Sequence, residues 1–260
     1  MRGSTLKRNN MSGTTIKLLV IILIFFIQGC EKKMEHKPQD FFEGEQLDIA
    51  QIIYDGNEHA LKNKIASVSR ETLNHPAKDN ITLLFWSFLN AMYDNITPER
   101  LKIITDLVKA GADPLQPRPA GGSSPAEFAM QGDKNVWIKA LLDGGLSPNA
   151  RDRIHKEPII FKSQYAKNTE TLKVMLDYGA DIDIRDSLDQ TLVMDAFLNS
   201  SFDHVELLLL RGANPNPVNV NGLSLLTVVK REIKDSKSGT EYNDRCKEIL
   251  KLMISKGAKE

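Results

Sequence analysis

The side chains that most often carry out chemistry are sparse in this 260-residue sequence. Its five histidines are scattered, with no His-x-x-x-His or Cys-x-x-Cys spacing that would hold a metal ion. The run Gly121-Gly122-Ser123-Ser124 places serines beside glycines, but it lacks the Gly-x-Ser-x-Gly order of a nucleophile elbow. No glycine-rich phosphate-binding loop occurs either. The sequence therefore predicts no enzyme activity, no metal site and no cofactor.

The chemistry that the sequence does favour lies at Cys30. Residues 18–27 are ten consecutive apolar residues, and they follow four basic residues with no acidic residue before Glu31. Ten residues are too few to span a bilayer as a helix, which needs about 20. This order of basic, apolar and small residues is typical of a secretory signal peptide. The residues Ile27-Gln28-Gly29-Cys30 resemble the lipobox of bacterial lipoproteins, in which the cysteine is acylated and becomes the first residue of the mature chain.

The lipobox resemblance implies a signal peptide at residues 1–29 and an acylated Cys30 followed by a charged tether up to residue 43. Glu31 and Lys32 follow without the aspartate that retains enteric lipoproteins in the inner membrane, which implies an outer-membrane anchor facing the periplasm. An uncleaved anchor, or a buried helix with a chance cysteine, is the alternative. With Cys30 acylated, Cys246 has no disulfide partner, and its helical surroundings favour a buried apolar role.

The balance of charge argues against a nucleic-acid partner. The whole chain holds 34 basic and 34 acidic residues, so its formal charge is zero. Cleavage before Cys30 removes four basic residues and no acidic ones, leaving 30 against 34. The mature form would therefore be mildly acidic, whereas a protein that binds nucleic acid usually presents a basic face.

The elements that must position any binding residues follow a repeat. Gly111, Gly145, Gly179 and Gly212 lie 34, 34 and 33 residues apart, and Gly257 follows 45 residues later. An apolar helix end precedes each glycine, and turn residues follow most of them. A glycine just past a helix can adopt the left-handed conformation that caps the last carbonyls. This pattern resembles the ankyrin repeat, whose period is about 33 residues, and it implies an all-α solenoid of stacked helix pairs.

A second set of residues fixes the register. Helix starts like the Thr-Pro-Leu of ankyrin repeats lie 21 residues before the glycine at Ser124, Pro158 and Thr191, and further away at Thr82 and Ser224. We expect the extra 8 and 12 residues of the outer two repeats to lie between their helices, where longer loops cost little closure entropy. The predicted domains are the acylated cysteine and tether at 30–43, an N-terminal helical cap at 44–78, and repeats at 79–112, 121–146, 155–180, 188–213 and 221–258.

Apolar spacing predicts what each element buries. Leu172, Met175 and Leu176, like Val205, Leu208 and Leu209, recur at helical spacing and give one apolar stripe per second helix. Stacking of neighbouring repeats would bury these stripes. In the cap, a helix pair at 47–54 and 58–68 would cover the outer face of the first repeat.

The ankyrin resemblance also implies a protein-binding surface along the hairpin tips and the first helices. In ankyrin arrays the fourth residue after the helix start, and the residue one turn further, face the concave side. Here the first set is Trp86, Phe128, Lys162, Asp195 and Val228, and the second is Leu89, Gln131, Tyr165, Leu198 and Arg231. The tips add Arg118, Arg151, Arg153, His155, Lys156, Arg185, Asp186 and Asp189. We expect Phe128 to be exposed as an interface anchor, and the tip charges to steer an acidic partner; Trp86 is either exposed or packed against the cap.

A narrower resemblance concerns the partner. The runs 81–90 (ITLLFWSFLN) and 48–57 (DIAQIIYDGN), with the lipobox, resemble the ankyrin-repeat lipoproteins encoded beside phospholipase effectors of type VI secretion, which serve as immunity proteins. This implies a secreted phospholipase as the protein partner, inhibition by covering its active site or lid, and membrane contact through the lipid anchor alone. A general periplasmic ankyrin scaffold is the alternative, and an enzyme or host-targeted effector is a third reading that the signal sequence disfavours.

Overall fold

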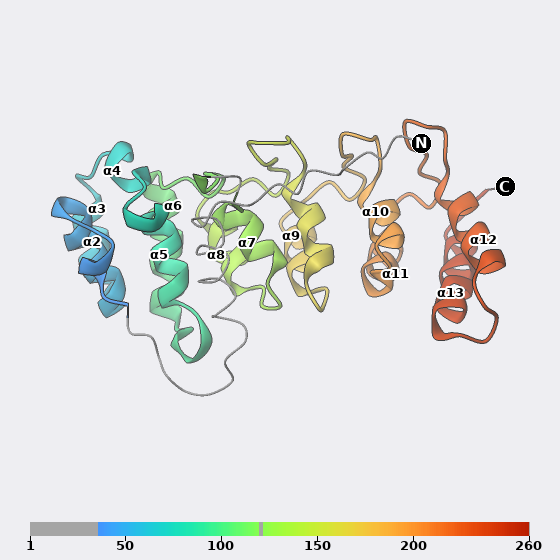
Figure 1. Cartoon of the computed structure of the whole chain (residues 1–260), viewed down its shortest axis with the longest axis horizontal. Helices are drawn as coiled ribbons and strands as arrows, with labels where there is room; N and C mark the ends of the chain where they lie inside the picture. Colours follow the sequence, from blue (N-terminus) through green and yellow to red (C-terminus); the bar gives the residue numbers. More distant parts are fainter. Residues whose placement is uncertain (1–35, 120–121, 260) are drawn as a thin grey trace, which may run out of the picture. The chain divides into compact units, whose positions relative to one another are not determined.

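The computed structural model of this chain describes residues 36–119 and 122–259. The predicted signal peptide and Cys30 lie outside the described residues, so the compact unit that begins at Lys37 is considered by itself. Within the described residues this unit is helical, and its β-structure is limited to four isolated bridges (Figure 1). None of the described helices is long and apolar enough to cross a bilayer.

The unit begins with a group of short helices. These are η1 (Pro38–Asp40), α2 (Gly44–Asp55), α3 (Glu58–Ile65), α4 (Arg70–Asn74) and η2 (Lys78–Asn80). Gly56 ends α2 with φ 70, and the Asn57 side chain accepts a hydrogen bond from the Ala60 N–H to start α3. The helices α2 and α3 pack against the first helix pair that follows. The helix α4 was not predicted from the sequence.

Five helix pairs follow within the described residues (Figure 1). They are α5 (Leu83–Asn90) with α6 (Pro98–Ala110), α7 (Pro125–Gln131) with α8 (Val136–Asp143), η5 (Ile159–Tyr165) with α9 (Glu170–Asp177), α10 (Leu192–Leu198) with α11 (Phe202–Leu210), and α12 (Leu225–Asp235) with α13 (Glu241–Ser255). The first helix of the third pair is a 3-10 helix preceded by Pro158. Each pair contacts the next along the chain, and this arrangement is a helical solenoid.

Local sequence explains where these helices begin and end. Ser124 caps α7, because its hydroxyl accepts from the Glu127 N–H while the Glu127 carboxylate accepts from the Ser124 N–H. The serine of the glycine-serine run is therefore a helix cap. The glycines of the repeat period end the second helices with φ between 86 and 110, a region that side chains other than glycine adopt only with strain.

The two longer repeats use their extra residues differently. In the first, they form a loop between α5 and α6 that includes η3 (Tyr93–Asn95), as expected. In the last, the expectation of a long loop is wrong, because the added residues extend α12 to Asp235 and start α13 at Glu241. Asn243 holds the short connection together by donating to Ile233 O and Ser236 Oγ, both at 2.9 Å.

The core runs through the whole unit as one cluster of buried side chains. On the second helices, Leu172, Met175 and Leu208 are fully buried, whereas Leu176 is only half-buried at the edge of its stripe. Cys246 is a free thiol buried on α13, and burial raises its pKa. It therefore acts as a small core residue.

Candidate protein-binding surface

The loops that join successive helix pairs form hairpins at one end of the pairs (Figure 1). Each is closed by an isolated antiparallel bridge; the four bridges join Arg118 to Gly122, Arg151 to Pro158, Arg185 to Thr191 and Val218 to Ser224. We call the residues inside the last three bridges, 152–157, 186–190 and 219–223, the second, third and fourth hairpin tips.

Hydrogen bonds join these tips into one rigid edge. The Val220 N–H of the fourth tip donates to Leu188 O of the third at 3.1 Å. The Ser187 N–H donates to the carboxylate of Glu157 in the second tip, 3.2 Å from Oε2. The Arg151 guanidinium donates to Arg185 O at 2.8 Å, from the earlier repeat to the later one. The tips are therefore held in place before any partner arrives, which reduces the entropy cost of binding.

Each of the three tips exposes one aliphatic side chain. Ile154, Leu188 and Val220 are 49 %, 51 % and 65 % exposed, and we call these three residues the tip patch. Val218, at the foot of the fourth tip, is exposed as well. These residues were not among the residues predicted from the sequence, which at the tips were all charged or histidine. An aliphatic residue in an otherwise polar turn was the signal that could have identified them.

The first helices contribute two further exposed apolar residues. Tyr165 is 63 % exposed and Leu198 45 % exposed, at the ends of η5 and α10. Arg231 is exposed on α12, with its guanidinium 3.6 Å from the adjacent Glu232 carboxylate. Gln131 is half-buried. Among the described apolar residues predicted on this helix face, Tyr165 and Leu198 are thus the exposed ones.

Three residues at positions expected on the concave side are packed. Trp86 is 2 % exposed, and its Nε1–H donates to Ala50 O at 3.0 Å, so the packed alternative holds and Trp86 joins α5 to the N-terminal helices. The prediction that Phe128 is exposed is wrong. Its ring is half-buried 5.4 Å from the ring of Phe85, because α5 and α7 pack side by side. Val228 is buried on α12.

The charged residues divide into structural and accessible ones. Arg185 is half-buried and donates to Val218 O at 3.0 Å while pairing with Asp189 at 3.1 Å, so it joins two tips. Lys162 is half-buried with its Nζ 3.6 Å from Glu127. Arg153 and His155 are exposed on either side of Ile154. The accessible basic residues therefore gather around the second tip.

Asp195 forms an acidic position on the same face. It is half-buried on α10, one turn before Leu198, and accepts hydrogen bonds from Gln164 at 2.5 Å and Asn199 at 3.3 Å. Burial, together with the nearby carboxylates of Asp186 and Glu157, raises the pKa of its carboxyl to about 6. A cationic group of a partner placed here would relieve this unfavourable burial of charge.

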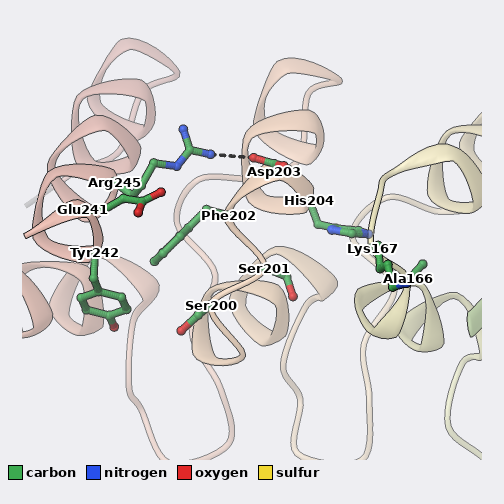
Figure 2. A pocket seen from close by; sticks show the side chains of 10 residues that line it. All are labelled: Ala166, Lys167, Ser200, Ser201, Phe202, Asp203, His204, Glu241, Tyr242 and Arg245. Atoms are coloured by element: carbon green, nitrogen blue, oxygen red, sulfur yellow. Dashed lines mark hydrogen bonds and ion pairs between the residues drawn. The ribbon is translucent and has the colours of Figure 1, made fainter. Parts of the chain in front are cut away.

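A pocket of about 460 Å³ lies at the opposite end of the helix pairs, where α11 and α13 begin (Figure 2). It contains Ser201, Asp203 and His204, residue types that form nucleophilic triads. Each is engaged elsewhere: Ser201 Oγ donates to Gln164 O at 3.3 Å, and Asp203 pairs with Arg245 at 2.8 Å. Burial lowers the pKa of His204, whose ring bonds the backbone of Ser163. No cluster of metal-ligating side chains occurs in the part of the chain that the structure describes.

This fold is the ankyrin-repeat solenoid. The chain is similar to the crystal structure of an ankyrin repeat domain from Acinetobacter baumannii AYE, with a TM-score of 0.56 and 18 % identity over 82 % of this chain and 98 % of that one. It is also similar to the ankyrin repeat domain of Bcl-3, a member of the IkappaB family, with a TM-score of 0.59 and 22 % identity over 81 % and 86 % of the two chains.

Curated relatives share the repeats over part of the chain. The chain is 25 % identical to human Ankyrin repeat and SOCS box protein 6 over 133 residues, and 31 % identical to the mouse B-cell lymphoma 3 protein homolog over 141 residues. These matches cover 46 % and 50 % of this chain but only 32 % and 31 % of the relatives' own lengths. No protein-family model matches the chain.

Proposed function

We propose that this chain is a lipid-anchored immunity protein that binds and inhibits a secreted phospholipase through its hairpin tips and first helices. The tip patch carries the binding part of the proposal, because three consecutive tips each expose an aliphatic residue on a hydrogen-bonded edge. The phospholipase comes from the resemblance of 48–57, 81–90 and the lipobox to type VI immunity lipoproteins.

The proposed surface has the composition of a protein interface. Exposed aliphatic and aromatic side chains such as Leu188 and Tyr165 can act as anchors that enter pockets on a partner. Around Ile154, the accessible Arg153, His155 and Lys156 would attract acidic groups and accelerate association. A partner that is apolar at its centre and acidic at the edge facing the second tip fits this arrangement.

Inhibition would result from coverage of the enzyme. The side chains on the proposed surface are anchors and charges, so the chain would act by blocking the partner's active site or membrane-facing lid. A rigid set of tips suits this mechanism, because little ordering is needed at the moment of binding.

The proposal predicts that a phospholipase gene lies beside the gene for this chain, and the decisive experiment is co-expression with that lipase. A cell that directs this lipase to its periplasm should die without the protein and survive with it. Leu188→Asp, in the tip patch, should abolish protection and the inhibition of phospholipid hydrolysis by purified protein. Leu210→Asp is the matched control, because Leu210 is similarly exposed but lies at the end of α11, outside the three hairpin tips. Survival without the protein, or death despite it, would favour a general scaffold. Loss of protection in both variants would contradict the tip patch as the specific binding surface.

The anchor forms a separate part of the proposal, since Cys30 lies outside the described residues. We propose that Cys30 is acylated and holds the protein at the outer membrane, where multiple acyl chains give stable attachment. Radiolabelled palmitate should be incorporated into the wild type but not into Cys30→Ser, which should leave the membrane fraction. A Cys30→Ser protein that still fractionates with outer membrane would contradict this.

A further inference from the structure

One hydrogen bond recurs between consecutive repeats. We call the glycines that mark the repeat, Gly111, Gly145, Gly179, Gly212 and Gly257, the period glycines. The acceptor is the side chain of the residue four positions after one period glycine. The donor is the backbone N–H of the residue two positions after the next period glycine. Asn149 accepts from Asp181 at 2.8 Å, and Asp183 accepts from Asn214 at 2.9 Å. Asn216 accepts from Lys259 at 2.7 Å. At these junctions an Asn or Asp oxygen therefore satisfies a backbone donor of the following repeat.

The N-terminal helices supply the same bond to the first repeat. Asn74, at the end of α4, accepts from the Asp113 N–H at 2.7 Å and donates to Gly111 O at 2.9 Å. Asn74 thus substitutes for a preceding repeat. This explains why α4 is present in a position where no repeat pattern predicts a helix.

Among the described residues, the junction between the first and second repeats lacks this hydrogen bond between repeats. Leu115 occupies the acceptor position, and its side chain offers no oxygen to the Ser147 N–H. A pocket of about 750 Å³ opens here, lined by Leu115, Gly145, Ser147, Arg70 and Arg153 among others. The pocket therefore lies where the Ser147 N–H lacks a side-chain acceptor.

The charges that face this pocket leave an excess of positive charge. They are Arg70, Asp113 and Arg153. The Arg153 guanidinium lies 2.6 Å from Asp113 Oδ2, while Asp113 Oδ1 accepts from the Leu115 N–H at 3.0 Å. Arg70 is exposed, and no ion pair joins it to the described acidic residues. Two guanidinium groups thus face one carboxylate.

The helices at this junction pack closely. A Cβ added at Gly144 would lie 2.6 Å from Val108 Cβ, so α6 and α8 approach closely. Thr105 Oγ1 donates to Ala140 O at 3.0 Å, and Trp137 Nε1–H donates to Ala91 O at 2.9 Å. These contacts hold α6 and α8 together beside the open pocket.

We propose that this pocket receives an aspartate or glutamate side chain from the protein partner. The incoming carboxylate would accept from the Ser147 N–H, as Asn and Asp side chains do at the other junctions, and would pair with Arg70 and Arg153. The inference rests on the proposed function for the source of the carboxylate, because it identifies a chemical group of that same partner.

The pocket can be tested without the partner. The full chain in a non-ionic detergent, labelled with ¹⁵N, is titrated with N-acetyl-aspartate methylamide. A saturable shift of the Ser147 amide signal is expected, and N-acetyl-leucine methylamide should cause none. Arg70→Gln and Arg153→Gln should each weaken the response several-fold. A Ser147 signal that does not respond, or that responds equally to the leucine compound, would overturn the proposal.

Leu115→Asn gives the sharpest variant, because it supplies the missing acceptor within the chain. It should abolish the Ser147 response to the aspartate probe and give a higher melting temperature than Leu115→Ala, which removes the same packing without adding an acceptor. Equal melting temperatures with an intact response would overturn the proposal. Binding of the probe without binding of the lipase would contradict the proposed function but support the carboxylate-binding pocket. Binding of the lipase without binding of the probe would contradict the pocket alone.

Discussion

The Asn149 side chain accepts a hydrogen bond from the Asp181 N–H at 2.8 Å, and this bond joins two hairpins that are 32 residues apart in the sequence. It is one member of a series that runs between neighbouring repeats. Because each repeat contacts only its neighbours, the stability of a solenoid is approximately a sum of such local terms. Single substitutions at the junctions should therefore have separable effects.

The hydrogen bond itself gives the first prediction. Asn149→Ala should lower the free energy of unfolding by about 1 kcal/mol, because the Asp181 N–H loses its acceptor. Urea unfolding followed by circular dichroism measures this. Asn221→Ala is the control, since the Asn221 side chain makes no hydrogen bond among the described residues. Equal losses in the two variants would show that the bond between repeats contributes nothing specific.

The apolar stripes give the second prediction. Leu208→Asp should cost several kcal/mol, because it places a charge at a fully buried position between repeats. Leu176→Asp should cost less, because Leu176 is half-buried and a carboxylate there can reach water. Thermal unfolding of both variants tests the ranking. The reverse order, or a far-UV spectrum dominated by β-structure, would contradict the register of the repeats.

The third prediction separates packing from binding. Trp86→Ala should lower the free energy of unfolding by about 3 to 5 kcal/mol, because it empties a buried site and removes the bond to Ala50. Tyr165→Ala should change unfolding by less than about 0.5 kcal/mol, since its side chain is mostly exposed. If Tyr165 is an anchor, the same change should weaken partner binding by at least about 1 to 2 kcal/mol. Calorimetry of unfolding and binding measures both effects, and a destabilised Tyr165→Ala would remove the distinction.

The fourth prediction concerns pH. Burial raises the pKa of Asp195 to about 6, above the value of the unfolded chain. Between about pH 4 and about pH 6 the folded state therefore retains a proton that the unfolded state has lost, so stability falls as pH rises through this range. Asp195→Asn should reduce this fall and leave the protein more stable than wild type near neutral pH. Urea midpoints at both ends of the range test this.

Asp235→Asn controls for the loss of one charge, because Asp235 is exposed at the end of α12. If the two variants have the same pH dependence as the wild type, Asp195 does not contribute to it.

The sequence alone determined the architecture, because the repeat is encoded locally. Glycines such as Gly145 and Gly179 must end a helix in a left-handed conformation, and Ser124 with Glu127 must begin one, whatever surrounds them. A regular spacing of such signals predicts stacked helix pairs. The ankyrin-repeat fold was confirmed for this reason.

Only the tertiary structure decided which side chains a partner can reach. Trp86 and Tyr165 both stand at helix positions expected to face outward, yet the N-terminal helices cover Trp86 while nothing among the described residues covers Tyr165. The exposed tip patch and the Ser147 N–H that lacks a side-chain acceptor depend likewise on neighbouring repeats. Helical signals act within a few residues, whereas burial is set by contacts between segments more than 30 residues apart, which local spacing does not encode.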